Sequence, residues 1–409
     1  MKFEWKPLGE IAEVTKLAGF EFTKYINYIE DGEIIALRAL NIRRGELDLS
    51  NVKRISKKIS EKLSRSKINR NDILLTYTGN SYGNCAIIDE SDKYHLAPNV
   101  CKIVPNQKLI DPYFLYCYIN STGFHKQMKN NVSGSAQPTI PMKAIRTLTI
   151  PVPKINVQKN ISKKIKLLDR KVKENKKLND NLKLTLTTIF ESQINSFGFD
   201  EANLTDIATY KNGLAMQKYR PKPNEQSLPV LKIKELNQGY TDTSSDRCSA
   251  KIDEDVTVHT GDIIFSWSGT LLVKNWSGKT AGLNQHLFKV TSKNYPDWFI
   301  YEWTKHHLRK FQSIAAGKAT TMGHIKRSDL ASSRVIIPDK NSLAKLDAIM
   351  KPLYDKRIEI IKENQRLIEI KKYCYKNIFK PLQNYHLYLQ TSYVWCNILK
   401  KGDFNHAKS

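Results

Sequence analysis

The chain of 409 residues alternates between two patterns of apolar and polar positions. In the first pattern, short runs rich in β-branched and aromatic residues are bounded by Gly, Asn and Asp, which is typical of strands. Such runs predict strands at 72–77, 86–88, 262–267 and 286–290. Apolar residues at helical spacing predict amphipathic helices at 112–119 and 297–306. This first pattern therefore indicates mixed α and β structure.

In the second pattern, apolar residues recur at alternating steps of four and three, which is the heptad spacing of a coiled coil. The pattern covers about residues 154–196 and again about 341–380. In the first stretch the apolar positions, with two polar interruptions, are Ile161, Ile165, Leu168, Val172, Asn175, Asn179, Leu182, Leu186 and Ile189. In the second stretch, with three polar interruptions, they are Leu346, Met350, Leu353, Arg357, Ile360, Asn364, Leu367, Lys371, Cys374 and Ile378.

Two heptad seams of similar length predict that the two helices pair with each other. Each seam would be about 60 Å long at 1.5 Å per residue, which is longer than one small domain. The alternative is that each helix packs only on the globular part that precedes it. Buried Asn and Arg on a seam would cost stability but fix its register. Pro153 and Pro338, just before the helices, mark their starts.

The chain also repeats itself. Five segments recur in the same order at a nearly constant offset, which chance similarity would not produce. The pairs are 8–12 with 204–208, 37–41 with 233–237, 71–79 with 261–269, 134–136 with 317–319, and 148–151 with 335–338. We therefore expect an α+β fold with two repeated mixed domains, each followed by a long helix. The predicted boundaries are 1–152 and 198–338 for the mixed domains, 153–197 and 339–380 for the helical regions, and 381–409 for an unassigned tail.

The net charge of the chain indicates what kind of partner it binds. Lys and Arg total 66 against 40 Asp and Glu, giving a net charge of +26. Such an excess repels itself unless a polyanion balances it, and nucleic acid is the polyanion that we expect. A Lys-rich composition inherited from an AT-rich genome would explain part of the excess. The six cysteines are scattered without metal-ligand spacing, and no leader or membrane span is evident, so we expect reduced thiols in a cytoplasm.

No catalytic pattern is complete. Asp297, Glu302 and Lys305 have the wrong spacing for a metal-dependent nuclease, and 174–176 falls on the heptad helix. The segment 111–114 resembles the tetrad that holds a flipped base, but its single proline fits an ordinary helix start better. The segment 278–280 lacks the first glycine of a phosphate-binding loop. We therefore expect a binding protein without a metal or cofactor.

The order of these features resembles the specificity (S) subunit of type I restriction-modification enzymes. The resemblance covers about residues 3–380 and rests on 5–12, on 71–74 with the Gly79 turn, on 282–286, and on 150–153 with Gln158 and Ile161. The second helix departs from the family because 338–342 lacks the usual Pro-x-x-x-Gln.

The resemblance implies that each mixed domain is a target recognition domain for half of a split sequence in double-stranded DNA. It implies that the helices pair antiparallel and set the unread spacer between the half-sites. It also implies two modification subunits that use S-adenosylmethionine to methylate adenine, and restriction subunits that translocate and cleave DNA. No membrane contact is expected.

Turns at strand ends are the best candidates for DNA contacts, because loops on a rigid scaffold carry binding. In the first domain these residues are Tyr77, Asn80, Ser81, Tyr82, Asn84, Ser135, Gln137 and Thr139. In the second domain they are Trp267, Ser268, Thr270, Lys274, Lys318, Thr320 and Thr321, with Trp276 nearby. Asn and Gln can pair with adenine, whereas Lys mainly meets phosphate or guanine. The alternative for each residue is an ordinary solvated turn.

Two other functions remain open at this point. The chain could be the recognition subunit of another assembly with this architecture, including a single-chain type II system. It could also be a basic coiled-coil scaffold that binds proteins, although the duplicated domains argue against this. Salt-dependent binding to a two-part duplex would separate the DNA-reading functions from the scaffold.

Overall fold

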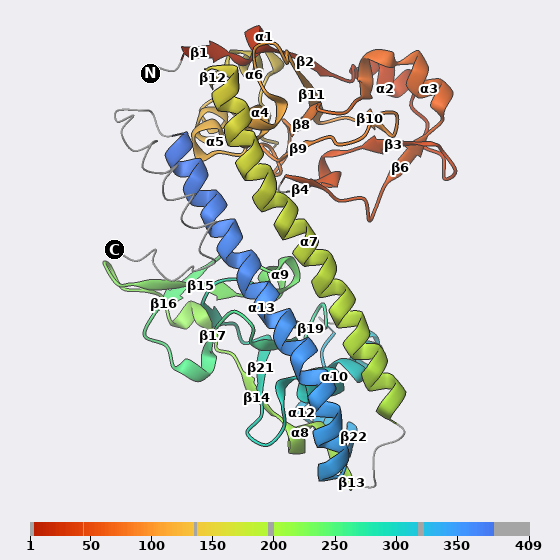
Figure 1. Cartoon of the computed structure of the whole chain (residues 1–409), viewed down its shortest axis with the longest axis vertical. Helices are drawn as coiled ribbons and strands as arrows, with labels where there is room; N and C mark the ends of the chain where they lie inside the picture. Colours follow the sequence, from red (N-terminus) through yellow and green to blue (C-terminus); the bar gives the residue numbers. More distant parts are fainter. Residues whose placement is uncertain (1–3, 44, 135–136, 195–199, 318–322, 380–409) are drawn as a thin grey trace. The chain divides into compact units, whose positions relative to one another are not determined.

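The computed structural model describes residues 4–43, 45–134, 137–194, 200–317 and 323–379, which form two compact units (Figure 1). Unit 1 consists of residues 1–168 and 370–409, and unit 2 of residues 169–369. Two long helices, α7 (Ile155–Gln193) and α13 (Lys340–Ile378), each contribute one end to each unit. The predicted long helices at 154–196 and 341–380 are therefore confirmed within the described residues.

Unit 1 contains two four-stranded sheets, in the orders β2-β11-β8-β9 and β6-β3-β10-β7, and two two-stranded sheets, β1-β12 and β4-β5. Its strands are β1 (Glu4–Pro7), β2 (Ala12–Lys16), β3 (Ile34–Leu37), β4 (Ile42–Arg43), β5 (Glu46–Leu47), β6 (Lys53–Ile55), β7 (Lys67–Ile68), β8 (Ile73–Thr76), β9 (Cys85–Ile87), β10 (Tyr94–Leu96), β11 (Val100–Pro105) and β12 (Thr149–Val152). Its shorter helices are α1 (Leu8–Ile11), α2 (Gly19–Tyr25), η1 (Ala39–Asn41), α3 (Lys57–Lys62), η2 (Ser64–Ser66), α4 (Pro112–Ile119), α5 (Thr122–Lys129) and α6 (Met142–Thr147).

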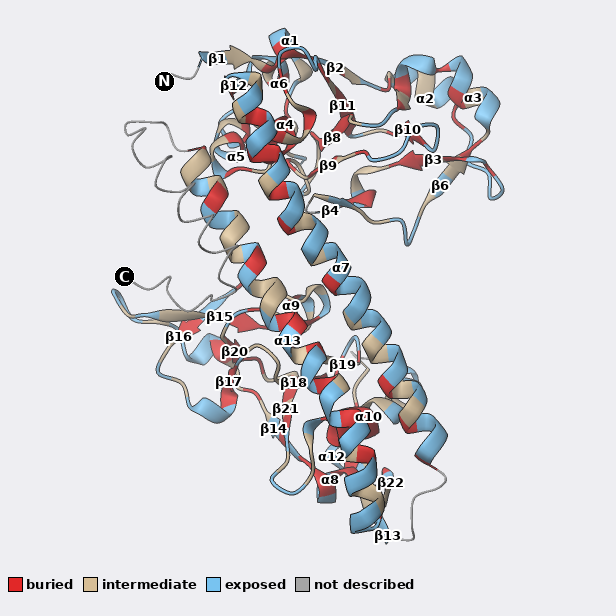
Figure 2. Cartoon of the chain, in the orientation of Figure 1, coloured by how far each residue is buried: buried red, intermediate tan, exposed pale blue. Residues whose placement is uncertain are grey.

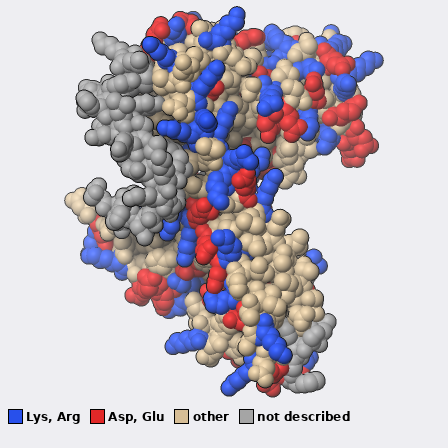
Figure 3. All heavy atoms as spheres, in the orientation of Figure 1, with Lys and Arg blue, Asp and Glu red and all other residues tan. Residues whose placement is uncertain are grey.

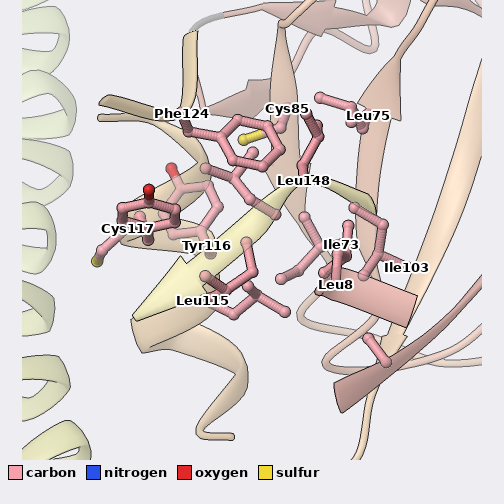
Figure 4. Packing of buried hydrophobic residues seen from close by; sticks show 14 of the residues in the cluster. Leu8, Ile73, Leu75, Cys85, Ile103, Leu115, Tyr116, Cys117, Phe124 and Leu148 are labelled. Carbon is pink, nitrogen blue, oxygen red and sulfur yellow. The ribbon is translucent and has the colours of Figure 1, made fainter. Parts of the chain in front are cut away.

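The core of unit 1 explains where α7 and α13 attach. Buried side chains from the β2-β11-β8-β9 sheet meet those of α1, α4 and α5, among them Leu8, Ile73, Leu115 and Phe124 (Figure 4). Ile161 and Ile165 of α7 and Phe379, just after α13, complete the same cluster. The second sheet, β6-β3-β10-β7, has a separate core that includes Ile34, Leu37 and Leu96. The helix ends are thus anchored by apolar burial.

Unit 2 repeats this architecture. Its sheets have the orders β14-β21-β18-β19, β16-β15-β20-β17 and β13-β22, which match β2-β11-β8-β9, β6-β3-β10-β7 and β1-β12 strand for strand. The strands are β13 (Asp200–Asn203), β14 (Thr209–Asn212), β15 (Ser227–Leu231), β16 (Arg247–Ser249), β17 (Thr257–Val258), β18 (Ile263–Ser266), β19 (Leu272–Asn275), β20 (Ala281–Leu283), β21 (Leu287–Thr291) and β22 (Arg334–Ile337). The shorter helices are α8 (Leu204–Ile207), η4 (Met216–Lys218), α9 (Ile233–Gln238), η5 (Glu254–Val256), α10 (Asp297–His306), α11 (Leu308–Ala316) and α12 (Arg327–Ala331).

These elements confirm the sequence prediction with one correction. The four predicted strands lie within one residue of β8, β9, β18 and β21, and both predicted short helices have the bounds of α4 and α10. The match of 37–41 with 233–237 is wrong by two residues. Leu37 pairs with Leu96, whereas the equivalent strand position, paired with Leu283, is Leu231. The segment after the strand is a short 3-10 helix in unit 1 and a six-residue α-helix in unit 2, so similar letters there do not mark the same position.

The helices pair antiparallel within unit 2. Asn175 Nδ2 of α7 donates to Glu363 Oε2 (2.7 Å) and Asn364 Oδ1 (3.0 Å) of α13. About one turn later in α7 and about two turns earlier in α13, Arg357 Nε donates to Asn179 Oδ1 at 3.1 Å. The polar seam residues thus bind each other, as expected if they fix the register. Buried positions recur along both helices (Figure 2).

The ends of the helices also pack on the folded domains. In unit 2, Leu186 and Phe190 of α7 share one core with Leu346 and Met350 of α13 and with Trp298 of α10. The alternative that each helix packs only on the domain before it is therefore wrong, because α7 also enters the core of unit 2, and the end of α13 that of unit 1. Among the described residues, no helix combines the length and apolar character needed to cross a membrane.

Candidate DNA interface

In unit 1, backbone hydrogen bonds join three segments at the end of β8. Gly79 N donates to Pro138 O (2.8 Å), Ile140 N donates to Tyr77 O (2.9 Å), and Tyr77 N donates to Asn99 O (3.2 Å). Gly79 has a φ of +83°, which favours glycine at this turn. We call the described residues 77–84, 97–99, 133–134 and 137–140 the first site. The sequence identified two of these segments and missed 97–99.

Unit 2 builds its equivalent with the same three hydrogen bonds. Gly269 N donates to Gly323 O (2.8 Å), Ile325 N to Trp267 O (3.1 Å), and Trp267 N to His286 O (3.4 Å). We call residues 267–270, 284–286 and 323–325 the second site. Because every bond of this framework joins backbone atoms, it can persist while the side chains change.

The candidate residues of the first site divide into buried and exposed groups. Tyr77 belongs to the core, and Lys16 Nζ lies 5.5 Å from the centroid of its ring. Burial raises the pKa of the Tyr77 hydroxyl. Asn84 Nδ2 donates to Ile42 O at 3.3 Å. Asn80 and Gln137 are exposed.

Three further candidates, Ser81, Tyr82 and Thr139, are half-buried. Thr139 Oγ1 donates to Gln137 O at 3.2 Å. The ring of Tyr82 packs against the core of unit 1. Ser135 lies outside the described residues.

The second site has a more aromatic base. Trp267 Nε1 donates to Asn212 Oδ1 at 3.1 Å, and its ring centroid lies 5.8 Å from that of His286 and 6.3 Å from that of His324. Ser268 is buried, and its Oγ is hydrogen-bonded to His286 Nδ1 at 3.1 Å. Thr270 is exposed.

The remaining candidates of unit 2 are bonded or buried within the fold, or lie outside the described residues. Lys274 Nζ donates to Asn237 O at 2.7 Å, and burial lowers the pKa of its ammonium group. Trp276 is fully buried, so its side chain supports the core rather than a turn. Lys318, Thr320 and Thr321 lie outside the described residues.

Sequence reasoning missed several side chains that the fold brings to these sites. Lys16 and Asn212 end equivalent strands and contact the aromatic ring at the base of each site. Gln285 and His286 lie in a half-buried turn beside Trp267. A signal was present for the turn, because 282–286 is part of the motif that carried the family resemblance, but strand pairing was needed to place it.

The carboxylate and lysine that resembled part of a nuclease site make contacts within the fold. Glu302 is buried, accepts a hydrogen bond from Thr187 Oγ1 (3.0 Å) and lies 3.6 Å from Lys305 Nζ, and burial raises its carboxyl pKa. No group of three metal-binding side chains lies together in the described part of the chain. Lys and Arg side chains are spread over the face shown in Figure 3, mixed with fewer Asp and Glu.

Comparison with known proteins identifies a shared family. Residues 2–184 and 198–372 each match the type I restriction modification DNA specificity domain. The EcoBI specificity subunit of Escherichia coli is 32% identical over 140 residues, which span 34% of this chain but only 29% of that protein. The EcoKI specificity subunit of E. coli is 23% identical over 385 residues, covering 83% of this chain and 79% of that protein.

A solved structure shares the fold. The type I restriction-modification S subunit from M. genitalium aligns with a TM-score of 0.52 at 14% identity, covering 93% of this chain and 97% of that one.

Proposed function

Because this chain belongs to the type I restriction modification DNA specificity domain family, we propose that it reads a two-part target in double-stranded DNA. Residues 1–152 and 198–338 each read one half-site. Residues 153–197 and 339–380 form the paired helices that set the spacer. The net charge of +26 supports a polyanionic ligand.

One observation carries this proposal: the two sites share a backbone framework but differ in the side chains mounted on it. Tyr77 occupies the place of Trp267, and Asn99 that of His286, while the hydrogen bonds around them are the same. A common scaffold with different polar groups is what two half-sites of different sequence require, because bases are read by side-chain hydrogen bonds in the groove.

We propose different roles for the buried and exposed candidates. Asn80, Gln137 and Thr270 are exposed and contact bases or phosphates, together with Ser135, Lys318, Thr320 and Thr321. Tyr77, Asn84, Ser268 and Lys274 are bonded within the fold and position the contacting residues.

The chain itself carries out no chemistry in this proposal and needs no cofactor. Two modification (methyltransferase) subunits bind along the paired helices, restriction subunits (translocase and nuclease) join them, and the complex works in the cytoplasm. The spacing of Asp297, Glu302 and Lys305, and the contacts of Glu302 with Thr187 and Lys305, support a non-catalytic role.

Co-expression with a modification subunit tests the proposal. Adenine methylation mapped over the host genome should show one motif with two short half-sites and an unread spacer. Methylation should be absent without this chain. Methylation at a continuous motif, or at the same motif without this chain, would refute the proposal.

A further inference from the structure

Unit 2 has an open pocket of about 340 Å³ beside the second site. Its floor is apolar, because Met216 of η4 and Val230 of β15 are both buried. Asn284, the first residue of the 284–286 segment of the second site, forms part of the wall. Asn284 Oδ1 accepts a hydrogen bond from His286 N at 3.3 Å, whereas its Nδ2 has no acceptor among the described residues. Asn284 therefore belongs both to the pocket wall and to the second site, and its Nδ2 is a hydrogen-bond donor without an acceptor among the described residues.

The charged walls of the pocket are mainly cationic. Arg220, Lys232 and Arg247 line it together with a single carboxylate, Asp246. Lys232 Nζ is hydrogen-bonded to Asp246, and this bond and the positive charges around it lower the carboxyl pKa of Asp246. The carboxylate is thus held within the fold by one lysine. The two arginines leave the pocket with an excess of positive charge, which suits a phosphate.

The repeat gives a second reason to regard these cations as functional. The strand pairing makes Lys232 equivalent to Arg38, and Arg247 equivalent to Arg54. These guanidinium groups are hydrogen-bonded within the fold in both units. Arg38 Nη2 donates to Asn51 Oδ1 (3.0 Å) and Arg54 Nη1 to Gly32 O (3.2 Å), while Arg247 Nε and Nη2 donate to Ser227 Oγ at 3.1 and 2.8 Å. Both units therefore place basic side chains at the same two positions, one directly after β3 or β15 and one in β6 or β16.

We propose that this pocket is a phosphate-binding site, and that its ligand is a backbone phosphate of the DNA next to the half-site read by the second site. Arg220 and Arg247 contact the phosphate oxygens, and Asn284 Nδ2 supplies a neutral hydrogen bond. This inference rests on the proposed function. Phosphate contacts position a protein on DNA without reading sequence. The pocket therefore contributes affinity and register but no base preference.

Binding of the full chain to duplex DNA over a range of salt concentrations tests the inference. Arg220→Ala and Arg247→Ala should each weaken binding several-fold, to the same extent on a methylation-mapped target and on a scrambled duplex. Each should also reduce the slope of log affinity against log salt by about one. Arg247→Lys should retain most of the slope. Lys293→Ala, which removes an exposed cation outside the pocket, is the matched control and should leave the slope unchanged.

The possible outcomes separate this inference from the proposed function. Wild-type chain that binds no duplex would overturn both. Wild-type binding with Arg220→Ala and Arg247→Ala indistinguishable from Lys293→Ala would overturn only the pocket. Calorimetry with AMP distinguishes a free phosphate ligand. AMP binding that Arg220→Ala abolishes while the salt slope for DNA is unchanged would show that the pocket serves a free nucleotide, contrary to the inference.

Discussion

The two units build the same turn, after β8 in unit 1 and after β18 in unit 2, with different side chains. In each, three backbone hydrogen bonds fix the turn after the central strand, and an aromatic ring lies at its base. That ring contacts Lys16 in unit 1 and Asn212 in unit 2. Because the framework uses main-chain atoms, substitutions on it change what is presented without moving the scaffold. This separation of scaffold from side chains allows one fold to present two different binding surfaces.

The units differ more sharply where the helices join them. In unit 1, Gln158 of α7 is buried, accepts a hydrogen bond from Asp111 N (2.7 Å) and donates to Leu109 O (3.1 Å) and Pro153 O (2.7 Å). Unit 2 lacks this glutamine, and near the start of α13 Trp298 Nε1 instead donates to Asp347 Oδ1 at 2.6 Å. The missing Pro-x-x-x-Gln motif thus corresponds to a different junction with the same connectivity.

The largest expected effect comes from changing the helices that both units share. Inserting seven residues after position 177 of α7 and seven after 361 of α13 keeps the heptad register and lies between the two polar pairs of the seam. Each helix lengthens by about 10 Å at 1.5 Å per residue, or roughly three base pairs at about 3.4 Å each. Methylation mapping should show both half-sites unchanged and a spacer longer by about three base pairs.

Insertion into α7 alone provides the control. Both helices attach to both cores, so lengthening only α7 shifts its polar residues relative to their partners on α13. Methylation should then fall at least about tenfold, because the seam loses its register. Normal methylation from the single insertion, or altered half-site bases from the double insertion, would contradict the idea that the helices set the spacer.

A smaller effect is expected where each helix joins its domain, and the loss of stability should differ between the two units. Gln158→Ala removes the partner of the buried Pro153 carbonyl and of two part-buried groups, Asp111 N–H and Leu109 C=O, and should destabilise unit 1 by about 1–3 kcal/mol. Asp347→Ala removes one bond at a half-buried position and should cost unit 2 about 1 kcal/mol or less. Hydrogen exchange across α4 and α10, with the exposed Lys159→Ala as a control, measures each junction. Equal losses in both units would show that the junctions are energetically equivalent.

The smallest expected effect is a difference in acid sensitivity. His95 is fully buried in unit 1, and burial lowers its pKa below 6.5, whereas the equivalent position of unit 2 is Gly282. The folded state therefore resists a proton that the unfolded state accepts, so stability falls as pH drops below about 6.5. The slope from this group cannot exceed about 1.4 kcal/mol per pH unit.

Denaturant unfolding between pH 7.5 and 5.5, followed by hydrogen exchange in each unit, measures this slope. His95→Gln should reduce the slope for unit 1 and leave that for unit 2 unchanged. His125, whose pKa is also lowered by burial, accounts for part of the remainder. An unaltered slope in the variant would assign the acid sensitivity of unit 1 elsewhere.

Sequence periodicity and internal repetition predicted most of the architecture. Both follow from local spacing, so α4, α10 and the heptad seam could be placed before any contact was known. The exposure of individual turn residues could not be predicted in this way. Trp276 and Asn80 both follow strands, yet one is fully buried and the other exposed, because burial depends on strands distant in sequence. The 97–99 segment was missed for the same reason, since only strand pairing brings Asn99 to Tyr77.

Exchanging one unit's recognition domain tests the central claim most directly. The chain would carry residues 1–152 from another family member of known target, with residues 153–409 unchanged, and would be co-expressed with its modification subunit. Methylation mapping should then show a new motif in which one half-site has become that of the donor, while the other half-site and the spacer are retained. A motif in which both half-sites change, or in which neither does, would contradict the account that each domain reads one half-site independently.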